Sequence, residues 1–144
     1  MSGSAVPALG VAAAQSILAE NFAPWVLDLG LRVEEVGAER ALLRLPFSER
    51  LVRVGGTLCG QALMSAADTA MVIALSGAFG GFRPVTTVSQ NVSFMRPVAG
   101  VDLMVEAKVL RLGRTLAFGE VLLRADGDAR LAGHATTTYA ILQA

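Results

Sequence analysis

Asp68 is the most unusual residue of the sequence, because it is the one charge in a long apolar stretch from Leu58 to Phe79. A carboxylate in such surroundings is costly unless it is paired or keeps an accessible face. A carboxylate retained there can serve as a general base. A structural aspartate that is hydrogen-bonded to a neighbouring backbone group or hydroxyl fits the same pattern, so both roles stay open.

A glycine-containing turn, residues 54–61, leads into this apolar stretch. The first backbone N–H groups of a helix have no partner within the helix and lie at the positive end of its dipole. Gly60, which has no side chain to obstruct a substrate, can therefore polarise a carbonyl or hold an oxyanion at this point. The alternative is that these glycines only turn the chain.

The spacing between Gly60 and Asp68 predicts how these residues are used. They are eight residues apart in the sequence, which corresponds to roughly 12 Å along a helix axis. One chain therefore cannot direct both at one carbonyl. If two such helices pack antiparallel in a two-fold dimer, Gly60 of one subunit can meet the partner subunit's Asp68.

Cysteine and histidine contribute little to this chemistry. Cys59 is the only cysteine, which excludes an internal disulfide and a zinc site of thiolate type. A reactive thiol at a helix start is one interpretation, but small-residue packing is favoured because no base lies nearby in the sequence. His134, the only histidine, is expected at the surface or an interface. We expect no metal and no redox cofactor.

The composition bounds the size and partners of the protein. The 144 residues predict one domain, residues 1–144, in which residues 1–8 form a disordered lead. A hydrophobic content of 53% and a mean hydropathy of +0.56 favour burial in an oligomer interface. The twelve basic residues balance the twelve acidic ones, so neither nucleic acid nor an anionic membrane is an expected partner. A basic signal segment is not apparent, and we expect a cytoplasmic protein.

The patterning predicts one short helix, two paired strands, one long helix and four further strands. The long helix is apolar all round and must therefore be buried on most of its circumference. The strands alternate and are separated by turn signals, so the last four should form consecutive hairpins. The predicted elements are helices 9–22 and 58–79, and strands 31–34, 41–45, 85–96, 101–109, 115–124 and 131–142. The fold class is α+β, an antiparallel sheet curled around one helix.

Three segments carry a resemblance to a known family. They are Gly56-Thr57-Leu58-Cys59-Gly60-Gln61, Ala66-Ala67-Asp68-Thr69-Ala70-Met71 and Asn91-Val92-Ser93-Phe94-Met95-Arg96-Pro97. Together they resemble the hot-dog-fold acyl-CoA thioesterases of the phenylacetate-degradation (PaaI-like) type. The resemblance covers roughly residues 30–142 and implies a long central helix wrapped by a curved antiparallel sheet.

The resemblance also implies roles for individual residues. Asp68 matches the residue that attacks the thioester or activates water, and Gly60 matches the backbone donor to the thioester carbonyl. Thr87 matches the hydroxyl residue that positions the water, with Thr86 one residue away as the alternative. Arg53 stands where some relatives have an asparagine six residues before the histidine of the motif.

Two positions depart from the family pattern, because Cys59 replaces that histidine and Gln61 replaces the second glycine. We expect both residues, with Arg53, to lie at the substrate. Arg96, together with Lys108, Arg111 and Arg114, can contact the phosphates of coenzyme A, although solvated charges at strand ends are an equal alternative.

The predicted function is hydrolysis of an acyl-CoA thioester to a free acid and coenzyme A by a homodimer or homotetramer. The alternative is a non-catalytic domain that binds acyl-CoA but has lost efficient chemistry at Cys59 and Gln61. A dehydratase of the same fold is disfavoured, because such enzymes pair the aspartate with a histidine close by in the sequence.

Overall fold

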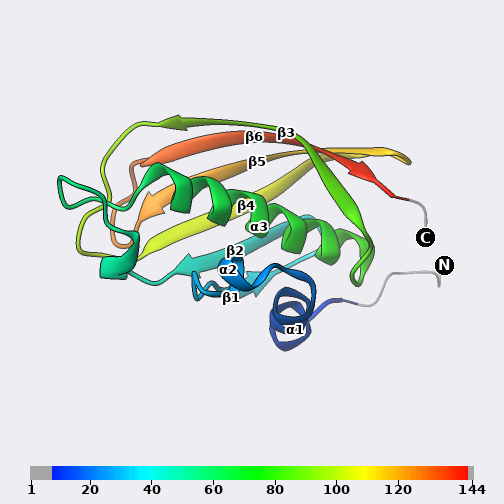
Figure 1. Cartoon of the computed structure of the whole chain (residues 1–144). Coiled ribbons are helices and arrows are strands. Elements are labelled where there is room, and N and C mark those ends of the chain that lie inside the picture. Colours follow the sequence, from blue (N-terminus) through cyan, green and yellow to red (C-terminus); the bar gives the residue numbers. More distant parts are fainter. Residues whose placement is uncertain (1–7, 143–144) are drawn as a thin grey trace.

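A single long helix, α3, lies in the concave face of a curved six-stranded antiparallel sheet (Figure 1). The computed structural model describes residues 8–142, so residues 1–7 of the expected disordered lead lie outside the described part. This is the predicted hot-dog architecture, in which the sheet wraps the helix. The elements are α1 (Val11–Asn21), α2 (Pro24–Leu27), β1 (Arg32–Val36), β2 (Arg40–Leu45), a 3-10 turn η1 (Glu49–Leu51), α3 (Gly60–Phe79), β3 (Val85–Phe94), β4 (Leu103–Leu112), β5 (Leu116–Ala125) and β6 (Gly133–Ile141).

The predicted helices and strands are present, with shifted ends and one addition. The short helix α2 was not predicted from the pattern, since four residues cannot show a helical period. Its proline occupies the first helical turn, where a missing N–H is tolerated.

Helix α3 is bounded by two residues with distinct backbone conformations. Cys59 precedes it in an extended conformation, with φ −70° and ψ 151°. Gly80 ends it in the left-handed region at φ 78°, and the N–H of Gly81 donates to the Ser76 carbonyl at 2.9 Å. Glycine is favoured at such a helix end because it carries no Cβ.

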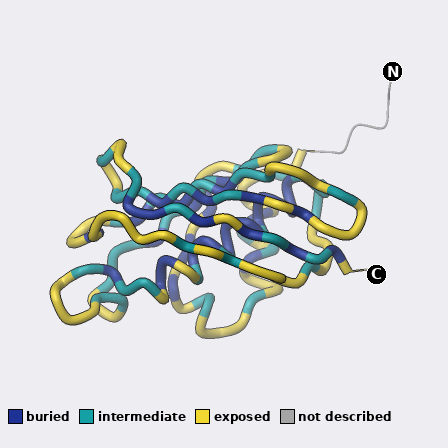
Figure 2. Tube along the Cα trace, turned by 90° about the horizontal axis from the view of Figure 1, so that it is seen from above, coloured by how far each residue is buried: buried dark blue, intermediate teal, exposed yellow. Residues whose placement is uncertain are grey.

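The apolar character of α3 is explained by its packing. By length and composition alone the helix could cross a membrane, with a mean hydropathy of 1.5 over an 18-residue window. In the structure 67% of that window is buried, and buried residues are concentrated where α3 faces the sheet (Figure 2). Burial against the sheet therefore accounts for a helix that is apolar on nearly every side.

The order of strands in the sheet corrects one prediction. The order is β1-β2-β4-β5-β6-β3, so β3 and β4 do not form the hairpin expected from consecutive strands. Residues 95–102 instead lead from the edge strand β3 to β4 in the middle of the sheet, three positions away. This segment can reach about 26 Å, which exceeds the roughly 14 Å that separates strands three positions apart. As a result β3 becomes an edge strand beside β6.

An ionic cluster fixes the start of β4 against β2. The Asp102 carboxylate accepts a hydrogen bond from the Phe47 backbone N–H at 2.7 Å and one from Arg44 Nη1 at 2.9 Å. Arg44 also lies 2.8 Å from Asp126. The Phe47 N–H, and next the Arg44 guanidinium, hold the pKa of Asp102 below its usual value. The cluster thereby positions the end of the crossing segment that follows β3.

Candidate active site

The start of α3 presents free backbone donors. Because Cys59 is extended and Gly60 is the first helical residue, the N–H groups of Gly60 and Gln61 point away from any carbonyl within the helix. Within residues 8–142 neither N–H donates to a protein acceptor. A Cβ at Gly60 would lie 3.2 Å from the Phe94 ring. The Gly60 N–H is thus available to a ligand carbonyl, next to an aromatic side chain.

A pocket of about 480 Å³ opens beside Gly60. Arg53 and Arg96, which come from segments far apart in the sequence, both line it, together with Phe94. Arg53 Nη1 donates to the Val54 carbonyl at 2.7 Å, and Arg96 Nη1 donates to a backbone carbonyl at 2.8 Å. Each guanidinium has five N–H donors, so each retains donors for an anion. This cavity is called the arginine pocket below.

A second, smaller pocket of about 220 Å³ lies on the other side of the helix start. Cys59 and Gln61 line it, whereas Gly60 between them lines the arginine pocket. Its wall combines the apolar side chains of Trp25, Leu29, Leu51 and Ala62 with the polar residues Asp28, Ser48 and Arg50. It is called the tryptophan pocket below. Residues 59–61 therefore separate a cavity lined by two arginines from one that contains an aromatic side chain.

Asp68, two turns further along α3, is held by two hydroxyl groups. Thr87 Oγ1 donates to Asp68 Oδ1 at 2.8 Å, and the Tyr139 hydroxyl donates to the same oxygen at 2.6 Å. Asp68 is only partly buried. Within residues 8–142 no protein group donates to Oδ2. One carboxylate oxygen is thus fixed while the other stays free.

The sheet register explains why two donors converge on one oxygen. Thr87 on β3 and Tyr139 on β6 are direct cross-strand partners, so their side chains leave the same face of the sheet. A β-bulge at Val88 follows immediately on β3. Thr86 pairs with Ala140 on the opposite face. The structure therefore places Thr87, and not the alternative Thr86, at the carboxylate.

Tyr139 was not predicted as a site residue. It is the only tyrosine and is 1% exposed. Burial, and next the charge of Asp68, raise the pKa of Tyr139 far above its usual value, so its hydroxyl stays protonated and donates. Alternation along β6 indicates that Tyr139 faces inward, but the register with β3 cannot be read from the sequence.

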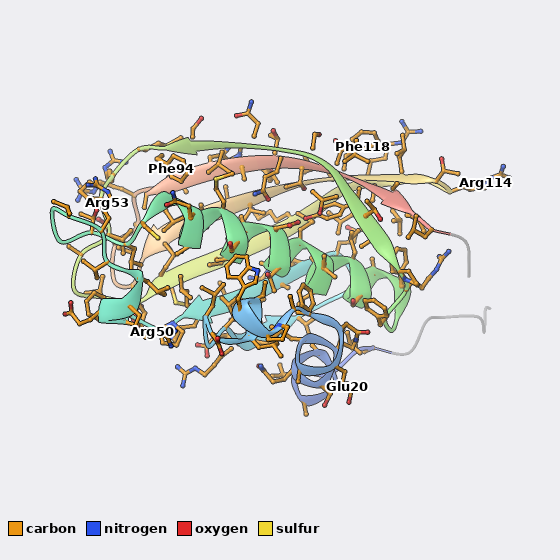
Figure 3. The ribbon with its side chains drawn as sticks, viewed as in Figure 1. Glu20, Arg50, Arg53, Phe94, Arg114 and Phe118 are labelled. Atoms are coloured by element: carbon orange, nitrogen blue, oxygen red, sulfur yellow. The ribbon has the colours of Figure 1, made fainter. Side chains whose placement is uncertain are left out.

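His134 and Arg114 lie outside this arrangement. His134 Nε2 lies 2.8 Å from Glu120 on the sheet face opposite to α3, because its neighbours Gly133 and Ala135 face inward. Cys59 is a free thiol. In residues 8–142 no group of three or more potential metal-ligating side chains occurs. Arg114 lies at the opposite end of the molecule from Arg53 (Figure 3), so within one chain it cannot share a ligand with the arginine pocket.

Asp68 lines neither of the two pockets at the start of α3. Helical geometry separates it from Gly60 by roughly 12 Å. Within one chain the Gly60 N–H and the Asp68 carboxylate are therefore two separate groups, called the half-sites below.

The fold is that of the hot-dog class, and comparisons with known proteins support a hydrolase. The model of the thioesterase superfamily matches residues 55–132, which is more than half of the chain. A protein from Halobacterium salinarum whose name proposes an esterase is 33% identical over 107 residues, covering 69% of this chain and 69% of that protein. The chain belongs to the thioesterase superfamily.

Solved structures of similar fold carry related names. Zebrafish thioesterase superfamily member 2 is 25% identical with a TM-score of 0.83, over 94% of this chain and 100% of that chain. A variant of the phenylacetic acid degradation protein PaaI from Thermus thermophilus is 25% identical with a TM-score of 0.73, over 83% and 100%. These similarities support hydrolysis of a thioester or ester bond.

Proposed function

We propose that the protein is an acyl-CoA thioesterase that works as a dimer or larger oligomer. The observation that carries the proposal is Asp68, a partly exposed carboxylate on an otherwise apolar helix, with Oδ1 fixed by two hydroxyls and Oδ2 free. Because Asp68 is partly exposed, Oδ2 is accessible to a water molecule or a substrate carbonyl. Membership of the thioesterase superfamily supports thioester or ester hydrolysis as the chemistry.

In the proposed reaction the Gly60 N–H polarises the thioester carbonyl. The partner subunit's Asp68 either attacks the carbonyl carbon or removes a proton from a water molecule that attacks it. In both cases the carbon–sulfur bond breaks, coenzyme A leaves as the thiol, and water supplies the second oxygen of the acid. Thr87 holds the carboxylate in either case.

Association through β3 is the proposed means of joining the half-sites. β3 is an edge strand of ten residues, and an unpaired edge is a template for pairing with a second strand. Its apolar residues Val88 and Phe94 are 59% and 52% exposed, and Met64 on the adjoining helix is 41% exposed. A second copy would cover these side chains and bring its own α3 alongside.

The arginine pocket supports coenzyme A as the thiol part of the substrate. Arg53 and Arg96 provide two guanidinium groups in one cavity that also contains Gly60. Guanidinium groups are well suited to phosphates, and the chain as a whole has no net charge that would bind anions non-specifically. An anionic thioester would therefore be held next to the carbonyl donor.

A mixed-dimer experiment tests the shared site. Asp68→Asn removes the carboxylate, and Gly60→Pro removes the N–H donor. Proline is tolerated at the first helical position, and the extended Cys59 has the conformation favoured before proline. Each variant alone should hydrolyse acyl-CoA poorly. After co-refolding of equal amounts, random pairing should restore about a quarter of the wild-type activity, because half of the dimers are mixed and each holds one intact site.

Gly60→Ala is the matched control, since it adds a Cβ beside Phe94 but keeps the N–H. It should retain far more activity than Gly60→Pro. No recovery after proven mixing would refute the shared site, whereas no hydrolysis by wild-type protein of any aliphatic or aromatic acyl-CoA in a thiol-release assay would favour the binding-domain alternative.

A further inference from the structure

We infer that Tyr139 is a positioning residue that, with Thr87, selects Asp68 Oδ2 as the reacting oxygen. The inference rests on the proposed function and concerns a residue outside the motif segments. Its basis is the pair of hydroxyls that converge on Oδ1 at 2.6 Å and 2.8 Å.

The two hydrogen bonds leave the carboxylate little rotational freedom. A carboxylate with one donor can rotate to exchange its oxygens, but two donors from adjacent strands fix both its plane and the identity of the bound oxygen. The strands that carry them are locked in register at this pair. Oδ2 must then face away from Tyr139 and Thr87, where a substrate carbonyl or water can approach it.

The Tyr139 hydroxyl also lies 3.1 Å from the Asp68 backbone carbonyl. It has one proton, and the carboxylate is both the closer and the charged acceptor. The hydroxyl should therefore hold the Asp68 carboxylate in a fixed orientation during catalysis.

Tyr139→Phe tests this role, because it removes only the hydroxyl. We expect kcat on the pH plateau to fall roughly tenfold to a hundredfold, as for loss of a hydrogen bond to a charged group, with KM nearly unchanged. Thr87→Val should act in the same direction.

Thr137→Val is the matched control on the same strand. Thr137 faces inward two residues before Tyr139 and is 3% exposed, but its hydroxyl has no partner within the described chain. It should leave kcat and KM unchanged. If folded Tyr139→Phe protein has a wild-type kcat, the positioning role is refuted, while the proposed hydrolysis by wild-type protein stands.

A second, independent observation concerns the tryptophan pocket. The geometry points to this cavity as the acyl site of the proposed thioesterase, with a single ring or a short chain as its occupant. It adjoins the arginine pocket across residues 59–61, so a thioester at Gly60 would have coenzyme A on one side and its acyl group on the other. Its volume of about 220 Å³ is below the roughly 300–1,000 Å³ of pockets that enclose drug-sized ligands.

Trp25 makes this assignment directly measurable. It is the only tryptophan, it is 60% exposed and it lines the pocket. Titration with S-benzyl-CoA, a thioether that cannot be hydrolysed as a thioester, should change Trp25 fluorescence saturably. Coenzyme A alone should not, and S-hexadecyl-CoA should bind at least tenfold more weakly.

Trp25→Ala should lower kcat/KM for benzoyl-CoA about tenfold, as expected for loss of an aromatic contact with the bound acyl group. Phe118→Ala, an exposed aromatic residue on the other sheet face, is the control and should be unaffected. The acyl-site assignment would be refuted if S-benzyl-CoA binds saturably without changing Trp25 emission. It would also be refuted if coenzyme A alone changes Trp25 emission equally. The proposed function would survive that result if benzoyl-CoA is still hydrolysed.

Discussion

Replacement of Asp68 by asparagine should abolish catalysis while it preserves the fold. Asparagine retains a carbonyl oxygen that can accept from both Thr87 and Tyr139, the two donors now 2.8 Å and 2.6 Å from Oδ1. Its NH2 group would take the place of Oδ2, which has no protein partner within residues 8–142. The change therefore exposes no buried donor, and we expect a loss of stability below about 1 kcal/mol.

The effect on rate should be much larger. Loss of a positioned base commonly costs about 10²–10⁴-fold, which corresponds to roughly 2.7–5.4 kcal/mol in the activation barrier. Loss of a nucleophile can cost more. Asp68→Ala removes the carboxylate acceptor of the Thr87 and Tyr139 hydroxyls. The backbone carbonyl of residue 68, 3.1 Å from the Tyr139 hydroxyl, remains as an acceptor, so we expect a further loss of stability of only about 1 kcal/mol.

The assay is thiol release from acyl-CoA, with kcat expressed per molecule shown by thermal melting to be folded. Binding of a thioether analogue should remain close to wild type. A purely structural aspartate would give the opposite pattern, with a lower melting temperature and normal turnover. Unchanged kcat in folded Asp68→Asn protein would therefore refute the catalytic assignment and favour a binding domain.

Three further predictions follow from other parts of the molecule. Cys59→Ser should lower kcat less than tenfold, and a loss of several orders of magnitude would identify a covalent cysteine mechanism. Sedimentation at micromolar concentration should show no stable monomer of the wild type. Val88→Lys, which places a charge on the exposed edge strand, should shift the protein toward monomer. An active wild-type monomer would contradict the shared site. Asp102→Asn should lower the Tm by a few degrees at neutral pH. Because the fold lowers the pKa of Asp102, its stabilisation is present above the unfolded value of about 3.9 and lost as pH falls through the lower folded value. The Tm difference should therefore close once the pH lies below that folded value. A difference that persists there would contradict this origin.

The main elements could be predicted from the sequence because their signals are local. Alternation places Leu103, Val105 and Ala107 inward, and all three are fully buried. The long apolar run, in which Asp68 is the one charge, predicted both ends of α3 to within two residues. The crossing of residues 95–102 has no such local signal, since Pro97 and Gly100 are equally typical of a tight turn. Which strands become neighbours is decided by packing around α3.

The site was predictable in part for the same reason. Asp68 stands out in the sequence because it is the one charged residue in an apolar helix, and Gly60 stands out because it is a glycine at the start of that helix. Tyr139 does not stand out in the same way, because tyrosine is a common residue at inward-facing positions of a strand. Its role depends on a contact between residues 71 positions apart, and that contact requires the register of two strands that are not consecutive.

The same strand that supplies Thr87 also forms the open edge of the sheet, and this links assembly to chemistry. The position of the free Asp68 oxygen is set by β3 through Thr87 and by β6 through Tyr139, while β3 offers its unpaired edge to a second copy. Pairing at that edge would restrain the backbone on both sides of the Val88 bulge, and with it the orientation of Thr87. Under the proposed dimer, association would therefore do more than bring Gly60 to the partner subunit's Asp68; it would also fix the hydroxyl that holds each chain's own carboxylate.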